Sequence, residues 1–380
     1  MPDCDALVLG AGLAGSSAAW SLAQRGMKVS VLDRHAQVAE EASGNPAGIY
    51  MPVLEAAPSL KEAFYLDALR LLHERLAEAS DRVSFQTCGV LHLPRDVKQS
   101  KRFQSIIDRK DLDSTTVSLI SASDARQKCG IPISEDGLFY PGGGWVSPRS
   151  LCNYYMEHPG ITLLSQRNVE TLRRYDGCWH AIDEDGNTIV ASDIAIIATG
   201  HLSANLEQAA WLPFHHVRGQ ITRLDLHSTH SLDCVICHQG YVLPLDEKEL
   251  VIGATYRRDR SGYVTDDAEH NENIHMLHQF LPEFAGTLEI DSRNSGRVGF
   301  RSVVPGRLPL VGRLPVPQKL RHRQPPVMYQ NLALSAAHAS RGILSSGISG
   351  EMLASELLNE ATGYTQYRKL VSPLRFLRHV

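Results

Sequence analysis

An α/β fold, α+β overall, is predicted by three features of this sequence. The chain opens on an apolar strand, a glycine-rich turn, a helical stretch and a second apolar strand, which is the order of a βαβ unit. A further buried strand at residues 192–200 ends in Ala-Thr-Gly and returns the chain to the same sheet. Short β segments then follow at 216–224, 241–244 and 250–256. We therefore expect a Rossmann-like parallel sheet that binds a nucleotide, with a second, mainly antiparallel domain.

The glycines of the first turn have the spacing of a dinucleotide-binding loop. An apolar run at 6–9 leads directly into Gly10, Gly12 and Gly15, which form G-x-G-x-x-G. In such a loop the first glycine permits the tight turn, the second lets the backbone approach a pyrophosphate, and the third lets helix and strand pack closely. The following helix then offers its free N–H groups and positive dipole end to the phosphates.

The rest of the unit falls in register with this loop. The pattern is helical from 14 to 24, Gly26 ends the helix, and an apolar strand at 29–32 closes at Asp33. Asp33 follows Gly10 by 23 residues, where an acidic side chain hydrogen-bonds a ribose 2′-OH and would repel the 2′-phosphate of NADP. The motif does not separate NAD from FAD, and the alternative is a glycine-rich turn without a ligand.

Length and composition indicate a globular protein of two domains. The chain has 380 residues, 43% hydrophobic and 21% charged. It has no run of eighteen apolar residues and no basic, then apolar leader, so we expect neither a membrane span nor a secretory signal. Its seven scattered cysteines favour a reducing compartment without a disulfide framework, and we expect a cytoplasmic protein.

The charge is unevenly distributed, although the net charge is only −4. Residues 292–350 contain no acidic side chain, and the segment after Ala361 adds only basic ones. The basic residues of 292–350 are Arg293, Arg297, Arg301, Arg307, Arg313, Lys319, Arg321, Arg323 and Arg341. This asymmetry predicts an anionic partner near the C-terminal third, and the alternative is a solvated basic face with some structural arginines.

Periodicity and turn residues place the remaining elements. The segment 41–52 is a loop of small residues, 139–148 is a glycine-rich crossing between domains, and 313–326 is a Pro- and Arg-rich surface excursion. Helices are expected at 59–78, 98–108, 121–130, 150–157, 270–280 and 343–358. Further strands are expected at 86–93, 161–165, 169–173, 179–182, 188–191 and 327–335.

Several motifs in one order resemble the D-amino-acid oxidase, glycine oxidase and sarcosine oxidase superfamily. Beside the glycine loop they are Gly-Tyr-Val-Leu-Pro at 240–244, Val-Ile-Gly-Ala-Thr-Tyr at 251–256, Gly-Phe-Arg at 299–301, Leu-Pro-Leu-Val-Gly at 308–312 and Ala-Ala-His-Ala-Ser-Arg-Gly-Ile at 336–343. The resemblance implies non-covalent FAD, bound extended with its adenine end on the first βαβ unit.

A narrower resemblance is to the FAD-dependent half of the bifunctional tRNA 5-methylaminomethyl-2-thiouridine biosynthesis family. It is carried by Ala-Ser-Gly-Asn-Pro-Ala-Gly-Ile-Tyr-Met-Pro at 42–52, Tyr-Pro-Gly-Gly-Gly-Trp-Val-Ser-Pro at 140–148, Ser-Arg-Gly-Ile-Leu at 340–344 and the basic C-terminal segment. It implies oxidative removal of a carboxymethyl group from the wobble uridine of tRNA, with dioxygen as electron acceptor.

This chain departs from that family's pattern in two places. The methyltransferase half is missing before the flavin motif, so a separate methyltransferase is the expected partner. Residues 345–350 are also more polar and glycine-rich than the family's segment.

The same resemblance suggests how the chain is divided. The FAD-binding domain is expected to use residues 1–85, 141–215 and 325–380, and the substrate domain residues 86–140 and 216–324.

The expected cofactor contacts combine the glycine loop with positions that the resemblance implies. They are Gly10, Gly12, Ala14, Gly15, Asp33, Arg34, Ser43, Gly44, Asn45, Gly48, Val169, Thr199, Gly200, Gly342 and Ile343. Gly342 and Ile343 open the terminal helix, whose dipole would favour negative charge on the flavin pyrimidine ring.

Three residues are expected to hold the substrate. Arg301, in Gly-Phe-Arg, matches the carboxylate-binding arginine of the superfamily, because a guanidinium grips a carboxylate in a bidentate manner. Tyr241 matches the tyrosine that contacts the same carboxylate, and Arg341 resembles a second pocket arginine. Their alternatives are a structural ion pair, an interior aromatic and a surface residue. Tyr50 and Trp145 are candidates to stack on the substrate base.

Other functions remain as alternatives. The enzyme could oxidise a free amino acid or secondary amine of the glycine, sarcosine or D-amino-acid type, or the chain could bind flavin without turnover. The run Cys234-Val-Ile-Cys-His238 has the form of a haem or redox motif, but its neighbours have a β pattern, and we expect neither haem nor metal.

Overall fold

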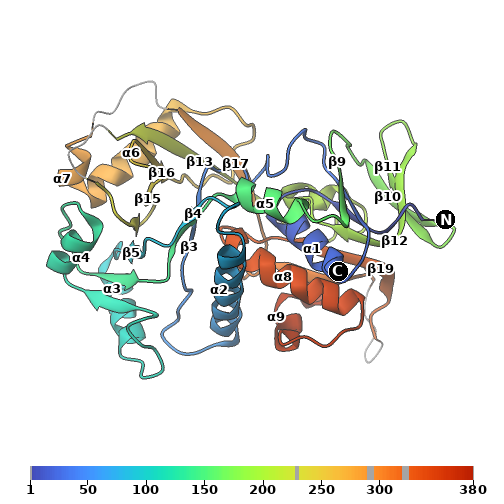
Figure 1. Cartoon of the computed structure of the whole chain (residues 1–380), viewed down its shortest axis with the longest axis horizontal. Helices are drawn as coiled ribbons and strands as arrows, with labels where there is room; N and C mark the ends of the chain where they lie inside the picture. The colour runs from blue at the N-terminus through green and yellow to red at the C-terminus, as the bar shows by residue number, and fades with distance from the viewer. Residues whose placement is uncertain (1, 227–230, 289–294, 319–324, 380) are drawn as a thin grey trace.

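The computed structural model describes residues 2–226, 231–288, 295–318 and 325–379. Arg293, Lys319, Arg321 and Arg323 of the basic segment lie outside these residues. Figure 1 shows two lobes side by side, one built on each of two large sheets.

The first sheet is the nucleotide-binding sheet that the sequence predicts. Its main path runs β10-β11-β12-β1-β2-β9, and β19 joins β12 and β18. The central pairs β1–β12, β1–β2, β2–β9 and β12–β19 are parallel, as in a doubly wound sheet. The strands are β1 (Cys4–Leu9), β2 (Val29–Leu32), β9 (Ile161–Leu164), β10 (Thr171–Tyr175), β11 (Cys178–Ile182), β12 (Thr188–Ile197), β18 (Leu310–Pro315) and β19 (Met328–Ala336).

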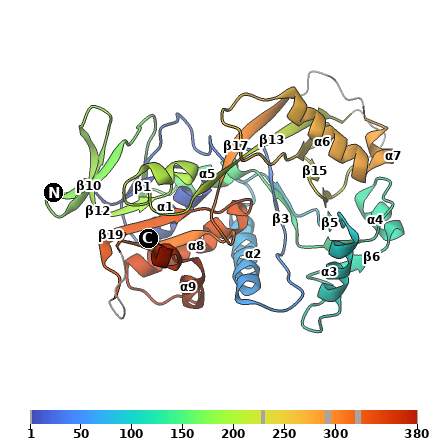
Figure 2. The same cartoon turned by 180° about the vertical axis from the view of Figure 1, so that it is seen from behind.

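Both faces of this sheet are buried, which explains the unbroken apolar runs of its strands. Ala6 and Val8 of β1 point into a core with four helices, whereas Leu7 and Leu9 point into a second core with Trp179. The helices are α1 (Leu13–Ala23), α2 (Leu60–Glu78), α5 (Pro148–Met156) and α8 (Gly342–Leu357). Figure 2 shows α2 beside α8, and short α9 (Arg368–Val371) follows near the C-terminus.

The second sheet forms the other lobe and is mainly antiparallel. Its order is β17-β13-β16-β15-β14-β5-β7-β6, with only β14–β5 parallel among its pairs. The strands are β5 (Val90–His92), β6 (Ser118–Ile120), β7 (Gly137–Tyr140), β13 (His215–Asp225), β14 (Val235–Cys237), β15 (Tyr241–Pro244), β16 (Glu249–Gly253) and β17 (Ser295–Val303). The helices α3 (Val97–Ile107), α4 (Ala122–Cys129), α6 (Asp267–Phe280) and α7 (Pro282–Ala285) pack on it.

A small third sheet lies where the lobes meet. It consists of β3 (Gly48–Tyr50), β8 (Gly144–Val146) and β4 (Phe85–Gln86). Ala47 and Trp145 pack against residues of the second sheet, whereas Tyr50 and Val146 belong to the core of the first. The glycine-rich segment 139–148 therefore does cross between the two sheets.

The structure confirms the predicted fold class and corrects some elements. The stretches expected at 188–191 and 192–200 form one continuous strand, β12, which ends at Ile197, and the expected strand at 86–93 is divided into β4 and β5. The expected surface excursion at 313–326 is wrong at its start, because β18 pairs with β19 through Pro315 and Leu314 is fully buried.

The sheet membership of β18 also bears on the expected domain division. Because β18 belongs to the nucleotide-binding sheet, we propose that the third segment of the FAD-binding domain begins near residue 310 rather than 325.

Candidate functional site

A cavity of about 560 Å³ runs along the carboxyl ends of β1, β2 and β12 and reaches the second sheet at Tyr241 and Arg301. This volume is within the usual range for cofactor sites. Beside these strand ends, its lining comes from the segments 10–14, 40–49, 167–170, 198–206, 300–302 and 335–343. The carboxyl edge of a parallel sheet is where doubly wound folds bind nucleotides.

The glycines of the first turn have separate structural roles. Gly10 has a φ of +102°, and a Cβ there would lie 2.6 Å from the carbonyl oxygen of Ala198. A Cβ on Gly15 would overlap the carbonyl oxygen of Gly10. Gly15 thus lets α1 pack against the turn and does not itself line the cavity, in keeping with the packing role predicted for it.

The N-terminus of α1 is open toward the cavity. Its N-cap, Gly12, makes no side-chain cap, and the first turn contains no acidic residue. Leu13 N donates to Ser43 Oγ at 3.1 Å, and Ala11 N donates to Asp33 Oδ2 at 2.7 Å. Asp33 is therefore fixed at the cavity wall, beside helix N–H groups suited to a phosphate.

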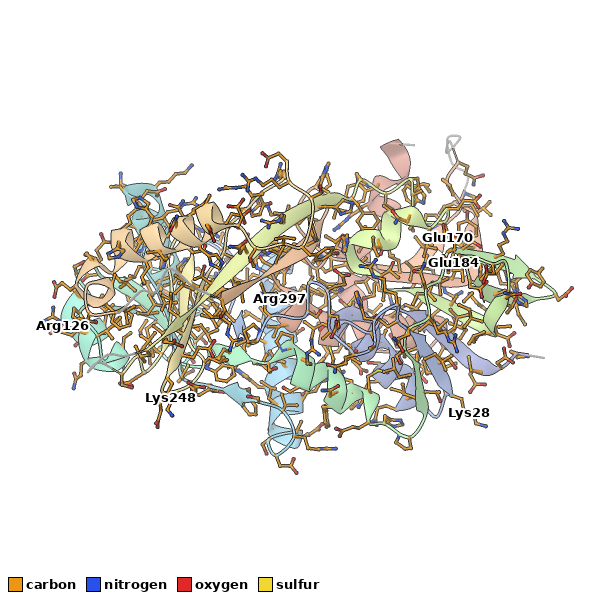
Figure 3. All side chains as sticks on the ribbon, turned by 90° about the horizontal axis from the view of Figure 1, so that it is seen from above. Lys28, Arg126, Glu170, Glu184, Lys248 and Arg297 are labelled. Atoms are coloured by element: carbon orange, nitrogen blue, oxygen red, sulfur yellow. The ribbon has the colours of Figure 1, made fainter. Side chains whose placement is uncertain are left out.

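The loop at 40–45 is held from the opposite lobe. Arg297 of β17 donates to the carbonyl oxygens of Glu40 and Glu41 and to Asn45 Oδ1, and it lies near the centre of the molecule (Figure 3). A Cβ on Gly44 would overlap its guanidinium, so Gly44 makes room for Arg297 and does not line the cavity. Burial lowers the pKa of Arg297.

Glu41 closes the same region of the cavity. Burial alone would raise the pKa of Glu41, but hydrogen bonds from His35, Tyr263 and Arg34 lower it to about 2. Tyr263 Oη donates to Glu41 Oε2 at 2.8 Å, and the burial of Tyr263 raises its pKa to about 12. This links the segment after β16 to the wall of the cavity.

At the other end, Arg301 and Tyr241 face the cavity together. The guanidinium of Arg301 lies against Gly219, where a Cβ would overlap it, and Nη1 donates to the carbonyl oxygen of Thr255 at 3.4 Å. No carboxylate of the described residues forms an ion pair with it. Burial lowers the pKa of Arg301 and raises that of Tyr241 to about 12. An anion brought by a ligand would give this cation its missing partner.

The structure does not bring Arg341 to this place. Its guanidinium lies 5.1 Å from the ring centre of Tyr65, and Arg341 is not among the residues that line the cavity. Gly342 and Ile343 do line the cavity, so the N-terminus of α8 faces it as expected. The predicted residues that line the cavity are Gly10, Gly12, Ala14, Asp33, Arg34, Ser43, Asn45, Gly48, Val169, Thr199, Gly200, Tyr241, Arg301, Gly342 and Ile343.

The chain matches the FAD dependent oxidoreductase (DAO) family over residues 5–356. It belongs to this family. FAD is therefore its cofactor, and the cavity fits that assignment through the open α1 N-terminus and Asp33. The chain is a FAD-dependent oxidoreductase.

Two curated proteins are similar to this chain over most of its length. The bifunctional protein MnmC of Stutzerimonas stutzeri, named for tRNA 5-methylaminomethyl-2-thiouridine biosynthesis, is 33% identical over 93% of this chain and 56% of its own length. The MnmC of Burkholderia orbicola is 34% identical over 98% of this chain and 60% of its own. The chain thus spans little more than half the length of these relatives.

Solved structures show the same fold. Iminodiacetate oxidase from Chelativorans is 25% identical with a TM-score of 0.78, over 97% of this chain and 98% of the oxidase. Glycine oxidase from Geobacillus kaustophilus has a TM-score of 0.79 at 17% identity, over the same shares of the two chains.

His338 lines the cavity but is not among the residues that the sequence analysis predicted for it. Its ring nitrogens lie 2.7 Å from Ser345 Oγ and 3.2 Å from Ser335 Oγ. Burial lowers its pKa to about 4, so the ring is neutral at ordinary pH. Its place inside the 336–343 motif was the available signal. Phe300, also in the lining, lies inside the Gly-Phe-Arg motif at 299–301, whereas His201 follows the Ala-Thr-Gly of 198–200 and is not part of it.

Several arginines of the basic C-terminal third have structural roles in this FAD enzyme. Arg313 donates to the carbonyl oxygens of Glu356 and Leu357 at the end of α8. Arg375 donates to those of Leu308 and Leu370. The charge asymmetry therefore reflects helix ends and buried carbonyl groups at these positions, and an anionic partner there stays a prediction.

The Cys-x-x-Cys-His run lies in and around β14 and is part of the packed second lobe. Burial raises the pKa of Cys237 to about 12 and lowers that of His238 to about 4. Among the described residues, no three His, Cys, Asp or Glu side chains are grouped to hold a metal. In the same part of the chain, no helix combines the length and the apolar character that crossing a membrane requires.

His238 predicts a pH dependence of stability. His238 is neutral in the folded protein but gains a proton near pH 6.5 when the chain is unfolded. Its contribution to the free energy of unfolding is therefore fully present above pH 6.5 and is lost as the pH falls toward 4. Between pH 7 and 5 this contribution amounts to about 2 kcal/mol. Urea unfolding of the holoenzyme should show that His238→Asn loses less stability than wild type over this interval. Parallel pH profiles for the two proteins would contradict the assignment.

Proposed function

We propose that this enzyme removes the carboxymethyl group from carboxymethylaminomethyl-uridine at the wobble position of tRNA. The products are aminomethyl-uridine and glyoxylate. The observation that carries the proposal is Arg301, a half-buried cation on the cavity wall without an acidic partner among the described residues. An unpaired buried charge is costly unless a ligand completes it, and the N–CH2–COO⁻ unit of this substrate supplies a carboxylate.

The chemistry requires the carbon between amine and carboxylate to lose two electrons. FAD, when bound, supplies the acceptor for these electrons and for the hydrogen that leaves with them. Arg301 holds the carboxylate, and the Tyr241 hydroxyl, which stays protonated because its pKa is about 12, donates to it. The resulting C=N bond is hydrolysed by water, which leaves the amine on the nucleoside and releases glyoxylate.

The relatives support this substrate class. MnmC is named for biosynthesis of a modified tRNA uridine, and iminodiacetate carries the same N–CH2–COO⁻ unit on its nitrogen. The second candidate, oxidation of free glycine, sarcosine or a D-amino acid, is favoured by the fold shared with glycine oxidase. Dioxygen as acceptor, a methyltransferase partner and a cytoplasmic location stay predictions.

Anaerobic bleaching of the flavin tests the proposal. The enzyme is mixed with tRNA that carries carboxymethylaminomethyl-uridine and, separately, with glycine, sarcosine and D-alanine. We expect rapid loss of the oxidised flavin band with the tRNA, and glyoxylate in the product. Bleaching by a free amino acid and none by tRNA would replace this function with the second candidate.

A further inference from the structure

The segment that follows β16 has two faces of different character. Arg257 forms an isolated antiparallel bridge with Arg218, in which the two residues exchange both backbone hydrogen bonds, at 2.8 and 2.9 Å, and the chain bends at Arg258. The residues around this bridge differ in exposure. Thr255 is buried and Arg257 is half-buried, whereas Tyr256 and Arg258 are exposed.

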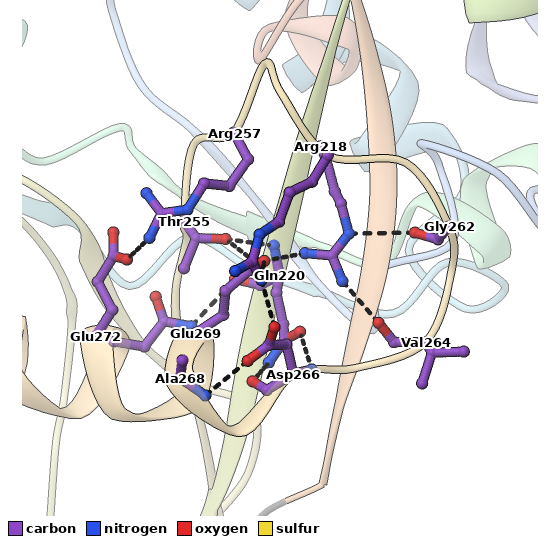
Figure 4. A network of polar contacts seen from close by, with 12 residues as sticks. Arg218, Gln220, Thr255, Arg257, Gly262, Val264, Asp266, Ala268, Glu269 and Glu272 are labelled. Carbon is purple, nitrogen blue, oxygen red and sulfur yellow. Dashed lines mark hydrogen bonds and ion pairs between the residues drawn. The ribbon is translucent and has the colours of Figure 1, made fainter.

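The inward face is fixed by the network of Figure 4. Glu269 of α6 accepts hydrogen bonds from Arg218 and from Thr255 Oγ1, and Arg257 pairs with Glu272. The other end of the loop is tied down as well, since Arg218 donates to the carbonyl oxygens of Gly262 at 3.1 Å and Val264 at 2.6 Å. The backbone that carries the outward side chains of Tyr256 and Arg258 is therefore held in place by hydrogen bonds and ion pairs.

The outward face consists of an aromatic ring and a free cation. Tyr256 is 43% exposed, and the guanidinium of Arg258 lies 5.7 Å from its ring centre. Within the described chain, neither side chain has a hydrogen bond or ion pair, although the neighbouring Arg257 and Arg260 are paired with acids. An exposed aromatic ring beside an arginine is the arrangement with which proteins hold an unpaired nucleobase and its phosphate.

This pair stands next to the proposed carboxylate anchor. Arg301 Nη1 donates to the carbonyl oxygen of Thr255, the residue that precedes Tyr256, at 3.4 Å. In the substrate, only a methylene, the nitrogen and a second methylene separate the carboxylate from the uracil ring. A base whose carboxylate is held at Arg301 therefore lies close to the backbone of Thr255, one residue before Tyr256. Tyr50 and Trp145, the stacking candidates of the sequence, are buried at 0% and 6% exposure.

We propose that Tyr256 and Arg258 form the platform that holds the unstacked wobble nucleotide, with the base on the Tyr256 ring and an anticodon phosphate on Arg258. This inference rests on the proposed tRNA function. It gives the chain a feature that a free amino acid would not use.

Single substitutions test the platform with the modified tRNA as substrate. Tyr256→Leu should lower kcat/KM by roughly 5- to 100-fold, and Tyr256→Phe, which keeps the ring, should restore most of it. Arg258→Gln should weaken binding and reduce the salt dependence of log KM by a slope of about 0.7, the value for one phosphate on a single strand. The matched controls are Tyr175→Leu, whose tyrosine is 44% exposed on β10, and Arg173→Ala on the same strand, which should behave as wild type.

The possible outcomes distinguish a failure of the platform from a failure of the proposed tRNA function. A wild-type enzyme that does not act on the tRNA overturns both. A wild-type enzyme that acts on it, with Tyr256→Leu and Arg258→Gln unchanged in kcat/KM and salt slope, overturns the platform alone. The oxidised flavin spectrum of each variant reports whether it has folded, and Arg258→Gln keeps the test decisive if Tyr256→Leu has not.

Discussion

Arg301→Met should abolish most of the activity, with kcat/KM lower by roughly 30- to several thousand-fold. The substitution removes the cation that holds the carboxylate, which loses two parallel charge-assisted hydrogen bonds on entering a desolvated site. Arg301→Lys keeps the charge but not the planar fork and should fall between wild type and Arg301→Met. Glyoxylate formation and single-turnover flavin bleaching at several substrate concentrations measure the effect.

The control for this prediction is the second arginine of the sequence analysis. Arg341→Met changes a guanidinium that lies over Tyr65 rather than in the cavity, so we expect kcat/KM within a few-fold of wild type. Both variants should retain flavin, since neither arginine belongs to the α1 turn or the loop at 40–45. An Arg341→Met loss as large as that of Arg301→Met would refute the placement of the carboxylate at Arg301.

The cofactor half of the site could be predicted because its signal is local. Gly10, Gly12 and Asp33 lie in one βαβ unit, where backbone geometry and spacing restrict the residue type. The Ser-x-x-Glu pattern at 59–62 is a similarly local signal for the start of α2, and in the structure the Ser59 hydroxyl accepts a hydrogen bond from Glu62 N at 3.1 Å.

The remaining features of the candidate site depend on contacts between residues that are far apart in the sequence. Arg297 reaches the carbonyl oxygen of Glu40 across 257 positions, and Tyr263 reaches Glu41 across 222. Arg341 shows the limit of a motif, because its neighbours Gly342 and Ile343 line the cavity but its own side chain points elsewhere. A motif gives the backbone path, whereas the direction of a long side chain depends on what packs around it.

The buried pair of Arg218 and Glu269 should dominate the stability of the second lobe. Both side chains are at most 3% exposed, so Glu269→Gln leaves a buried guanidinium without its counter-charge. We expect a loss of about 3–5 kcal/mol in the free energy of unfolding, measured by urea unfolding with flavin and tryptophan signals. Arg257→Met is the matched control. It breaks a pair whose side chains are each 34% exposed and should cost no more than about 1 kcal/mol.

The double variant Arg218→Met, Glu269→Leu tests whether the second lobe needs the ion pair itself or only side chains that fill the same space. It removes both ions together, so neither is left unpaired, and much of the lost stability should return. The carbonyl oxygens of Gly262 and Val264 still lose their donor, however, and Thr255 Oγ1 loses its acceptor. We therefore expect a stable protein whose loop after β16 is less ordered and whose KM for the tRNA is raised. Recovery of stability with an unchanged KM would show that the network serves folding alone.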